Sequence, residues 1–134
     1  MTRHALPLAL LLAAAAPAAA QRIVSPDAFL DAAEGNTLTF VLDGTGDLVG
    51  TERFLSRTRS VWARADGSCS YGDVSVEGAE LCFVYEDSPD AKWCWWPLRR
   101  GDDLLVRSTA PDHETQRIAA VTQDLVGCEG EPVS

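Results

Sequence analysis

The chain has 134 residues, of which 46% are apolar, with 11 basic and 20 acidic side chains and a net charge of -9. A chain of this length and composition is typical of one small globular domain. Its excess of negative charge argues against nucleic acid and anionic membrane surfaces as partners, because contacts with phosphates need concentrated positive charge.

The first twenty residues are typical of a secretory signal peptide. A short polar start at 2–4 precedes an apolar run from Ala5 to Ala16 and a small-residue end that closes at Ala20. This order predicts export with cleavage near Ala20, and an uncleaved anchor is the alternative. The apolar run is too short for a stable membrane span. We therefore expect residues 21–134 to form a single β-rich domain in the periplasm or outside the cell.

A short helix is predicted directly after the signal peptide. Ser25 suits the N-cap, Pro26 the first helical position and Gly35 the position after the last turn. One face carries small and aromatic side chains at helical spacing: Ala28, Phe29, Ala32 and Ala33. Because so short a helix is marginal alone, we expect it to plug one end of a barrel or to cover one face of a sheet.

From residue 36 onward the chain alternates between β-forming runs and turn residues. The eight predicted strands cover residues 37–42, 48–55, 58–65, 68–77, 79–85, 91–98, 103–108 and 115–125, and the last of these is ambiguous between strand and helix. We expect a bulge or bend at Gly50, an interruption at Gly72, and the end of sheet hydrogen bonding or an edge at Pro97. The fold class is mainly β, an antiparallel meander or small barrel with one N-terminal helix, and the tail beyond Cys128 is predicted to be loose.

Four cysteines follow the signal peptide, and an even number in a small exported domain predicts two disulfides. Zinc is the alternative, but the chain has no Cys-x-x-Cys pair and a single histidine after the signal peptide. An antiparallel hairpin around the turn at 86–90 brings Cys82 opposite Cys94, which leaves Cys69 to pair with Cys128. Spacing alone allows three connectivities, and this one is preferred for its register.

The same register sorts the hairpin side chains into two faces. The inner face pairs Leu81 with Trp95, Phe83 with Trp93 and Tyr85 with Ala91. Trp95 and Trp96 are candidate binding residues. The inner Trp95 also fits ordinary core packing, and the outer Trp96 either anchors a partner or is covered by the N-terminal helix.

The central strands carry the pattern Trp62…Asp66-Gly67-x-Cys69-x-x-Gly72, followed by Cys82-Phe83-x-Tyr85 and by Cys94-Trp95. It resembles the W…DGxCxxG…CFxY…CW pattern of small exported bacterial proteins of unknown function that have a compact lipocalin-like β domain. The resemblance implies the fold. It implies no activity and no catalytic residue, because a fold does not determine function.

Two polar groups are the other candidate sites. Arg53, Arg57, Arg59 and Arg64 lie in a stretch without acidic residues, which suggests an anion or carboxylate site, or a solvated face paired with acids from elsewhere. Asp112, His113 and Glu114 follow a proline in a predicted surface loop. The chain has no nucleophile elbow or phosphate loop, so we predict no catalytic residue, metal site or cofactor.

We therefore expect a non-catalytic binding protein whose partner is an envelope protein or a small amphipathic ligand. A ligand carrier requires an internal cavity lined by Trp62, Phe83, Trp93 and Trp95. The alternatives are a hydrolase inhibitor that uses a protruding loop such as 86–90 or the N-terminal segment, a weak hydrolase built on Asp112, His113 or Glu114, and a purely structural envelope component. Ligand identity and oligomeric state stay open.

Overall fold

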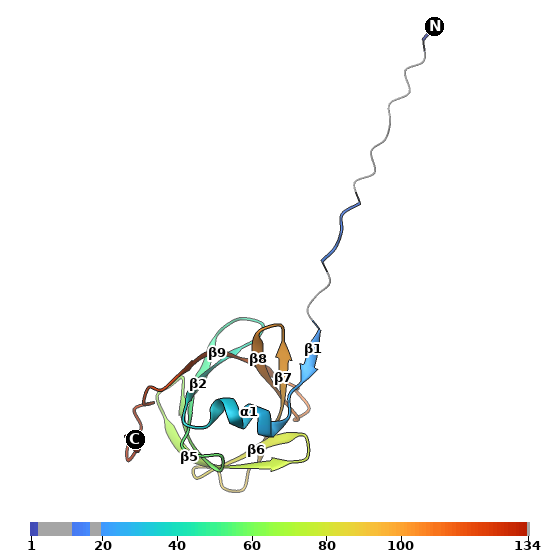
Figure 1. The fold of residues 1–134 in the computed structure, drawn as a ribbon. Helices are drawn as coiled ribbons and strands as arrows, with labels where there is room; N and C mark the ends of the chain where they lie inside the picture. Colours follow the sequence, from blue (N-terminus) through green and yellow to red (C-terminus); the bar gives the residue numbers. More distant parts are fainter. Residues whose placement is uncertain (3–11, 17–19, 134) are drawn as a thin grey trace.

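A computed structural model of the chain describes residues 1–2, 12–16 and 20–133. The predicted signal peptide lies mostly outside the described residues. From residue 20 onward the chain forms a closed antiparallel barrel of eight strands, with one extra short strand on its outside and one short helix (Figure 1). The predicted fold class is confirmed, and of its two alternatives the barrel is the one observed.

The barrel is an up-and-down meander, in which each strand pairs with the next along the chain and the last returns to the first. Its strands are β2 (Thr37–Leu42), β3 (Leu48–Phe54), β4 (Arg59–Arg64), β5 (Cys69–Glu77), β6 (Glu80–Tyr85), β7 (Trp93–Arg100), β8 (Asp103–Ser108) and β9 (Thr115–Thr122). Pairing of β9 with β2 closes the ring. Closure leaves the eight strands without an open sheet edge.

Two expectations about glycines have different outcomes. The β2–β3 register shifts between Phe40 and Val41, opposite Gly50, so an irregularity lies where the bulge was predicted. The interruption predicted at Gly72 is wrong, because β5 continues through it and Gly72 pairs with Ser60 on one side and Tyr85 on the other. The ambiguous segment near the C-terminus is strand β9.

The prediction for Pro97 is also wrong. Pairing of β7 with β6 ends at Trp95, and beyond it the unpredicted strand β1 (Gln21–Ile23) takes the place of β6. The backbone N–H of Val24 donates to the carbonyl of Pro97 at 3.0 Å, while β8 pairs with the other side of Pro97. Strand β1 therefore continues the hydrogen bonding of β7 at Pro97. The sequence pattern did not predict this strand.

Helix α1 (Pro26–Ala33) closes one end of the barrel. The Ser25 hydroxyl accepts a hydrogen bond from the Ala28 N–H at 3.1 Å, as expected of an N-cap, and Gly35 has a φ of 77°. The strands encircle α1 in Figure 1. The predicted face is partly wrong, since Ala28 and Ala32 are exposed. The buried face lies at the i, i+3, i+4 and i+7 positions: Pro26, Phe29, Leu30 and Ala33.

Both predicted disulfides are present. Cys82 and Cys94 join β6 to β7 with their Cα atoms 4.1 Å apart, and Cys69 and Cys128 join β5 to the C-terminal tail. Leu81 pairs with Trp95 and Phe83 with Trp93, as the hairpin register predicts. The predicted pairing of Tyr85 with Ala91 is wrong, because β7 begins only at Trp93. Two disulfides are consistent with a protein that folds outside the reducing cytoplasm.

The loose tail is a wrong prediction. The Glu131 carboxylate accepts hydrogen bonds from the backbone N–H groups of Val126 and Gly127, both at 2.9 Å, and pairs with Arg53 at 3.1 Å. The Tyr71 hydroxyl donates to the carbonyl of Glu129 at 2.9 Å. These contacts tie the tail to the barrel wall on either side of the disulfide.

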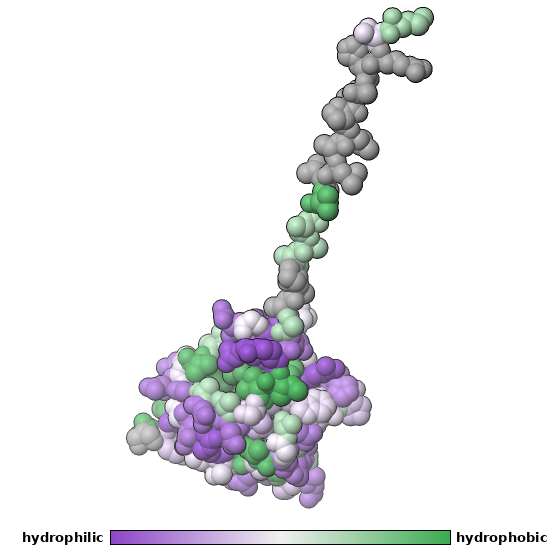
Figure 2. All heavy atoms as spheres, turned by 45° about the vertical axis from the view of Figure 1, so that its right-hand side comes forward, coloured by the Kyte–Doolittle hydropathy of each residue, from purple (hydrophilic) through white to green (hydrophobic). Residues whose placement is uncertain are grey.

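Hydrophilic and hydrophobic residues are interspersed over the face of the barrel shown in Figure 2. Ile23 is the most exposed large apolar side chain of the barrel domain apart from Val133 near the C-terminus. In the part of the chain that the structure describes, no helix is both long and apolar enough to cross a membrane.

Candidate functional site

The barrel contains a cavity of about 310 Å³. Its lining is mainly apolar and includes an aromatic wall, made of side chains from six positions on β2, β4, β6 and β7: Phe40, Trp62, Phe83, Tyr85, Trp93 and Trp95. Phe29 of α1 forms part of the lining at the closed end and meets Phe54 edge-on, with ring centroids 6.1 Å apart. The four residues that a ligand carrier requires, Trp62, Phe83, Trp93 and Trp95, all line this cavity.

The cavity opens at the end of the barrel away from α1. Ser88, Ala110 and Asp112, which belong to the β6–β7 and β8–β9 loops, line it at this end. Trp93, at the first position of β7, is 49% exposed although it belongs to the lining. Solvent therefore reaches the lining at the end of the barrel that these two loops form.

Two glycines leave space for two rings of the aromatic wall. A Cβ atom at Gly50 would lie 2.7 Å from the Trp62 ring, and that ring meets Phe40 edge-on at a centroid distance of 5.8 Å. A Cβ atom at Gly72 would lie 2.8 Å from the ring of Tyr85, which stacks on Phe83 at 6.0 Å. Each of the two rings thus packs over a glycine, where the neighbouring strand has no side chain.

One carboxyl group lies within this aromatic wall. Glu52 on β3 is 4% exposed, and its Oε1 atom accepts hydrogen bonds from the Ser60 hydroxyl at 2.7 Å and the Tyr85 hydroxyl at 2.8 Å. Burial raises the pKa of Glu52 to about 7, although both hydrogen bonds act in the opposite direction. Burial and the neighbouring Glu52 also raise the pKa of Tyr85, so its hydroxyl keeps the proton that it donates.

The second oxygen of Glu52 faces the cavity. No donor in the described part of the chain bonds to Oε2. Within the same part, no buried side-chain oxygen lacks a hydrogen-bond partner. Oε2 is therefore accessible, and the opening available to it is the cavity that Glu52 lines.

Sequence reasoning missed Glu52. The available signal was its spacing, since Glu52 lies two residues before Phe54 on one strand and shares its face. That signal was weak, because each face of the predicted strand 48–55 contains two apolar residues and one charged residue. Either face could have been assigned to the interior.

The charges around the cavity are mostly negative. Besides Glu52, the lining contains Asp112, Glu114 and one cation, Arg64. The Arg64 guanidinium pairs with Asp87 at 2.8 Å, which offsets its charge. The mouth therefore favours cations over anions.

The arginines of the predicted site are dispersed, and each of them pairs with an acidic side chain. Arg57 pairs with Asp31 at 2.8 Å, while Arg53 pairs with Glu131 and Arg59 with Asp73 and Glu86. None of these three arginines lines the cavity. An anion site at Arg53, Arg57 and Arg59 stays a prediction.

Trp95 and Trp96 point to opposite sides of β7. Trp95 lines the cavity, whereas Trp96 lies outside and stacks on the His113 ring at a centroid distance of 6.1 Å. His113 Nδ1 lies 3.1 Å from the carbonyl oxygen of Ser108. Asp112 and Glu114 line the cavity while His113 does not, so these three neighbours do not converge on one point.

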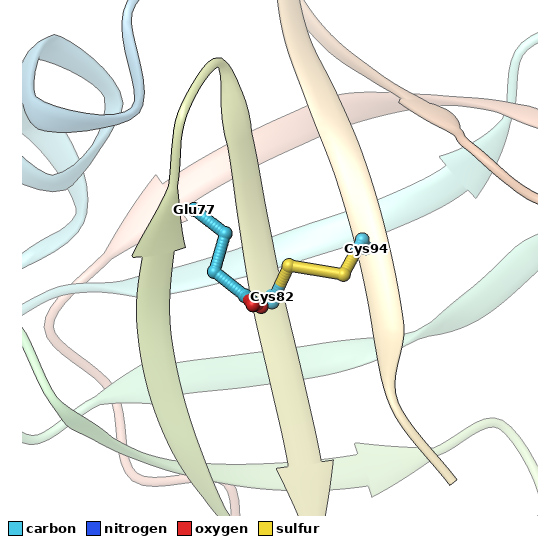
Figure 3. A group of neighbouring side chains, drawn as sticks. All are labelled: Glu77, Cys82 and Cys94. Atoms are coloured by element: carbon cyan, nitrogen blue, oxygen red, sulfur yellow. A yellow bond between two sulfur atoms is a disulfide. The ribbon is translucent and has the colours of Figure 1, made fainter.

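A group with the appearance of a metal site surrounds one disulfide. Glu77, Cys82 and Cys94 place their potential ligand atoms within 4.8 Å of one another (Figure 3). Both sulfur atoms belong to the disulfide and cannot act as thiolate ligands. The remaining carboxylate pairs with Lys92 at 2.9 Å, so this group is a structural feature of the β5–β7 wall.

The chain matches no protein-family model, and no curated protein or solved structure is significantly similar to it. Its function is therefore inferred from the chemistry of the cavity.

Proposed function

We propose that this protein binds a small, largely apolar ligand inside its barrel and acts as a carrier or receptor for it. The observation that carries the proposal is the open aromatic cavity of about 310 Å³, which contains one buried carboxyl group. Ligand sites in proteins typically have volumes of about 300–1,000 Å³ and are lined by apolar side chains with a few polar groups. Eight-stranded barrels are wide enough to hold one small ligand.

The location proposed for this function is the periplasm or the exterior of a bacterial cell. The predicted signal peptide, the two disulfides and the resemblance to small exported proteins support it. The disulfides also favour a preformed site. The Cys82–Cys94 bridge joins two strands that contribute four of the aromatic wall residues.

The proposal is tested with 6-propionyl-2-(dimethylamino)naphthalene, a neutral two-ring dye whose emission shifts to the blue in apolar surroundings. We expect saturable binding with a blue shift and with quenching of tryptophan emission, because three tryptophans line the cavity. Val106 also lines it and is buried, so Val106→Phe fills part of the space and should weaken binding at least tenfold.

The matched control is Val121→Phe, which adds the same ring at a position that is 53% exposed and outside the cavity lining. It should bind the dye like the wild type. Circular dichroism and thermal unfolding check that both variants fold. If the wild type does not bind the dye, or if both variants bind it equally well, the cavity is not a ligand site.

A further inference from the structure

The hydrogen bonding of Glu52 is one-sided. Ser60 and Tyr85 both donate to Oε1, and Oε2 faces the cavity without a donor from the described chain. A carboxylate accepts through both oxygens. When Glu52 is ionised, the group that completes this site is a hydrogen-bond donor, and a positively charged donor forms the stronger bond.

The surroundings of Oε2 also favour a cation. Trp62 is the direct cross-strand neighbour of Glu52, and aromatic rings attract ammonium groups. The other charged groups of the cavity are Asp112, Glu114 and the paired Arg64. A carboxylate ligand would have to approach Glu52 past two further carboxylates, whereas an ammonium group is attracted along the same path.

Resting on the proposed ligand-binding function, we propose that the ligand is a small cationic amphiphile whose amine pairs with Glu52 and whose flat apolar body lies between the aromatic walls. The volume sets the size of that body. A protein cavity of about 150 Å³ holds one benzene molecule. A cavity of about 310 Å³ therefore has room for about two fused rings with a short amine-bearing arm.

Pairing with an ammonium group requires the ionised form of Glu52. When the protonated carboxyl binds an ammonium ligand, the carboxyl proton is released to solvent and the ligand keeps its own charge. Burial raises the pKa of Glu52 to about 7, so this proton must be removed below neutral pH and is already partly lost above it. The affinity for an amine should therefore rise between about pH 5.5 and pH 8, while the affinity for a neutral analogue should not change.

The experiment compares naphthalen-1-ylmethylamine with its isosteric alcohol, naphthalen-1-ylmethanol, by isothermal titration calorimetry on the disulfide-bonded protein. At pH 8 we expect the amine to bind about ten- to hundredfold more tightly than the alcohol. Glu52→Gln keeps the side-chain size and removes the charge, so it should abolish this preference and leave binding of the alcohol within threefold. Glu129→Gln, a charge removal at an exposed position outside the lining, should retain the preference.

Each outcome separates the two proposals. Equal binding of amine and alcohol to the wild type, or an amine preference that persists in Glu52→Gln, overturns the amine assignment and leaves the cavity as an apolar ligand site. Tighter binding of 1-naphthoic acid than of the amine overturns it as well. Failure of all three naphthalenes to bind overturns the proposed function itself. The pH series on the wild type decides the question even if Glu52→Gln does not fold.

Discussion

Glu52 is a carboxyl group that folding removes from water, and this burial has a consequence for stability as well as for binding. Its pKa rises on folding from about 4.5 to about 7. The folded protein therefore holds a proton across an interval in which the unfolded chain has lost it. The proton on Glu52 stabilises the folded state fully below about pH 4.5, and this stabilisation is lost as the pH rises through about 7. The difference between the pKa of Glu52 in the unfolded and folded states corresponds to about 3 kcal/mol of folding free energy.

We expect the free energy of unfolding of the wild type to fall by about 2–3 kcal/mol between pH 5 and pH 8 because of this group. In Glu52→Gln the decrease should be largely absent, since an amide does not ionise. The measurement is urea unfolding at several pH values, with Glu129→Gln as the control for loss of one exposed charge. Asp43, Asp87 and Glu131 have lowered pKa values and act in the opposite direction at lower pH. Parallel pH profiles for wild type and Glu52→Gln would show that Glu52 is not the group responsible.

The sequence predicted four lining residues, Trp62, Phe83, Trp93 and Trp95, but not the carboxyl group among them. The tryptophans and Phe83 are recognisable because large aromatic side chains in short strands are usually buried. Glu52 is not, because acidic residues are rarely buried and nothing near it in the sequence indicates its partners. Its two hydrogen-bond donors come from other strands, 8 and 33 residues further along the chain.

At the level of the strands, one cross-strand row builds the Glu52 site. Ser60 on β4, Gly72 on β5 and Tyr85 on β6 are consecutive neighbours in the sheet. The missing side chain at Gly72 lets the Tyr85 ring lie over β5, where its hydroxyl reaches Glu52. The residue that was predicted to interrupt β5 is therefore the one that makes the hydrogen bond possible.

Gly72→Ala should destabilise the protein by about 1–3 kcal/mol, because the new Cβ atom would lie 2.8 Å from the Tyr85 ring and the ring would have to move. Urea unfolding measures the loss. The control is Gly44→Ala in the β2–β3 turn, where a Cβ atom meets no atom within 4 Å and φ is not positive. A Gly72→Ala protein as stable as the wild type would mean that the ring position is not fixed by this glycine.

The elements with local signals were predicted well. Ser25, Pro26 and Gly35 define α1 through capping chemistry within one short segment, and the alternation around Cys82 and Cys94 defines the hairpin. The wrong predictions concern segments whose contacts are with residues distant in the sequence. Strand β1 has three exposed residues and forms only because β7 extends past β6, and the tail is ordered only through contacts with β3 and β5.

For the whole molecule, the two disulfides close loops of very different length. Cys82 and Cys94 are 12 residues apart within one hairpin, whereas Cys69 and Cys128 are 59 residues apart and the segment between them contains strands β5 to β9. A cross-link stabilises mainly by restricting the unfolded chain, and the effect grows with loop length. The expected contributions are about 4 kcal/mol for the long loop and about 3 kcal/mol for the hairpin.

We therefore expect Cys69→Ala/Cys128→Ala to lower the free energy of unfolding by about 4 kcal/mol. Cys82→Ala/Cys94→Ala should lower the free energy of unfolding by about 3 kcal/mol, because the shorter loop is no longer closed in the unfolded chain. A further decrease is expected because Cys82 is 1% exposed and replacing its sulfur leaves a small cavity. Urea unfolding of the two oxidised double variants measures both. The dye-binding site should survive in the first variant, because neither Cys69 nor Cys128 lines the cavity. Loss of dye binding in a folded Cys69→Ala/Cys128→Ala protein would instead show that the tail maintains the shape of the barrel.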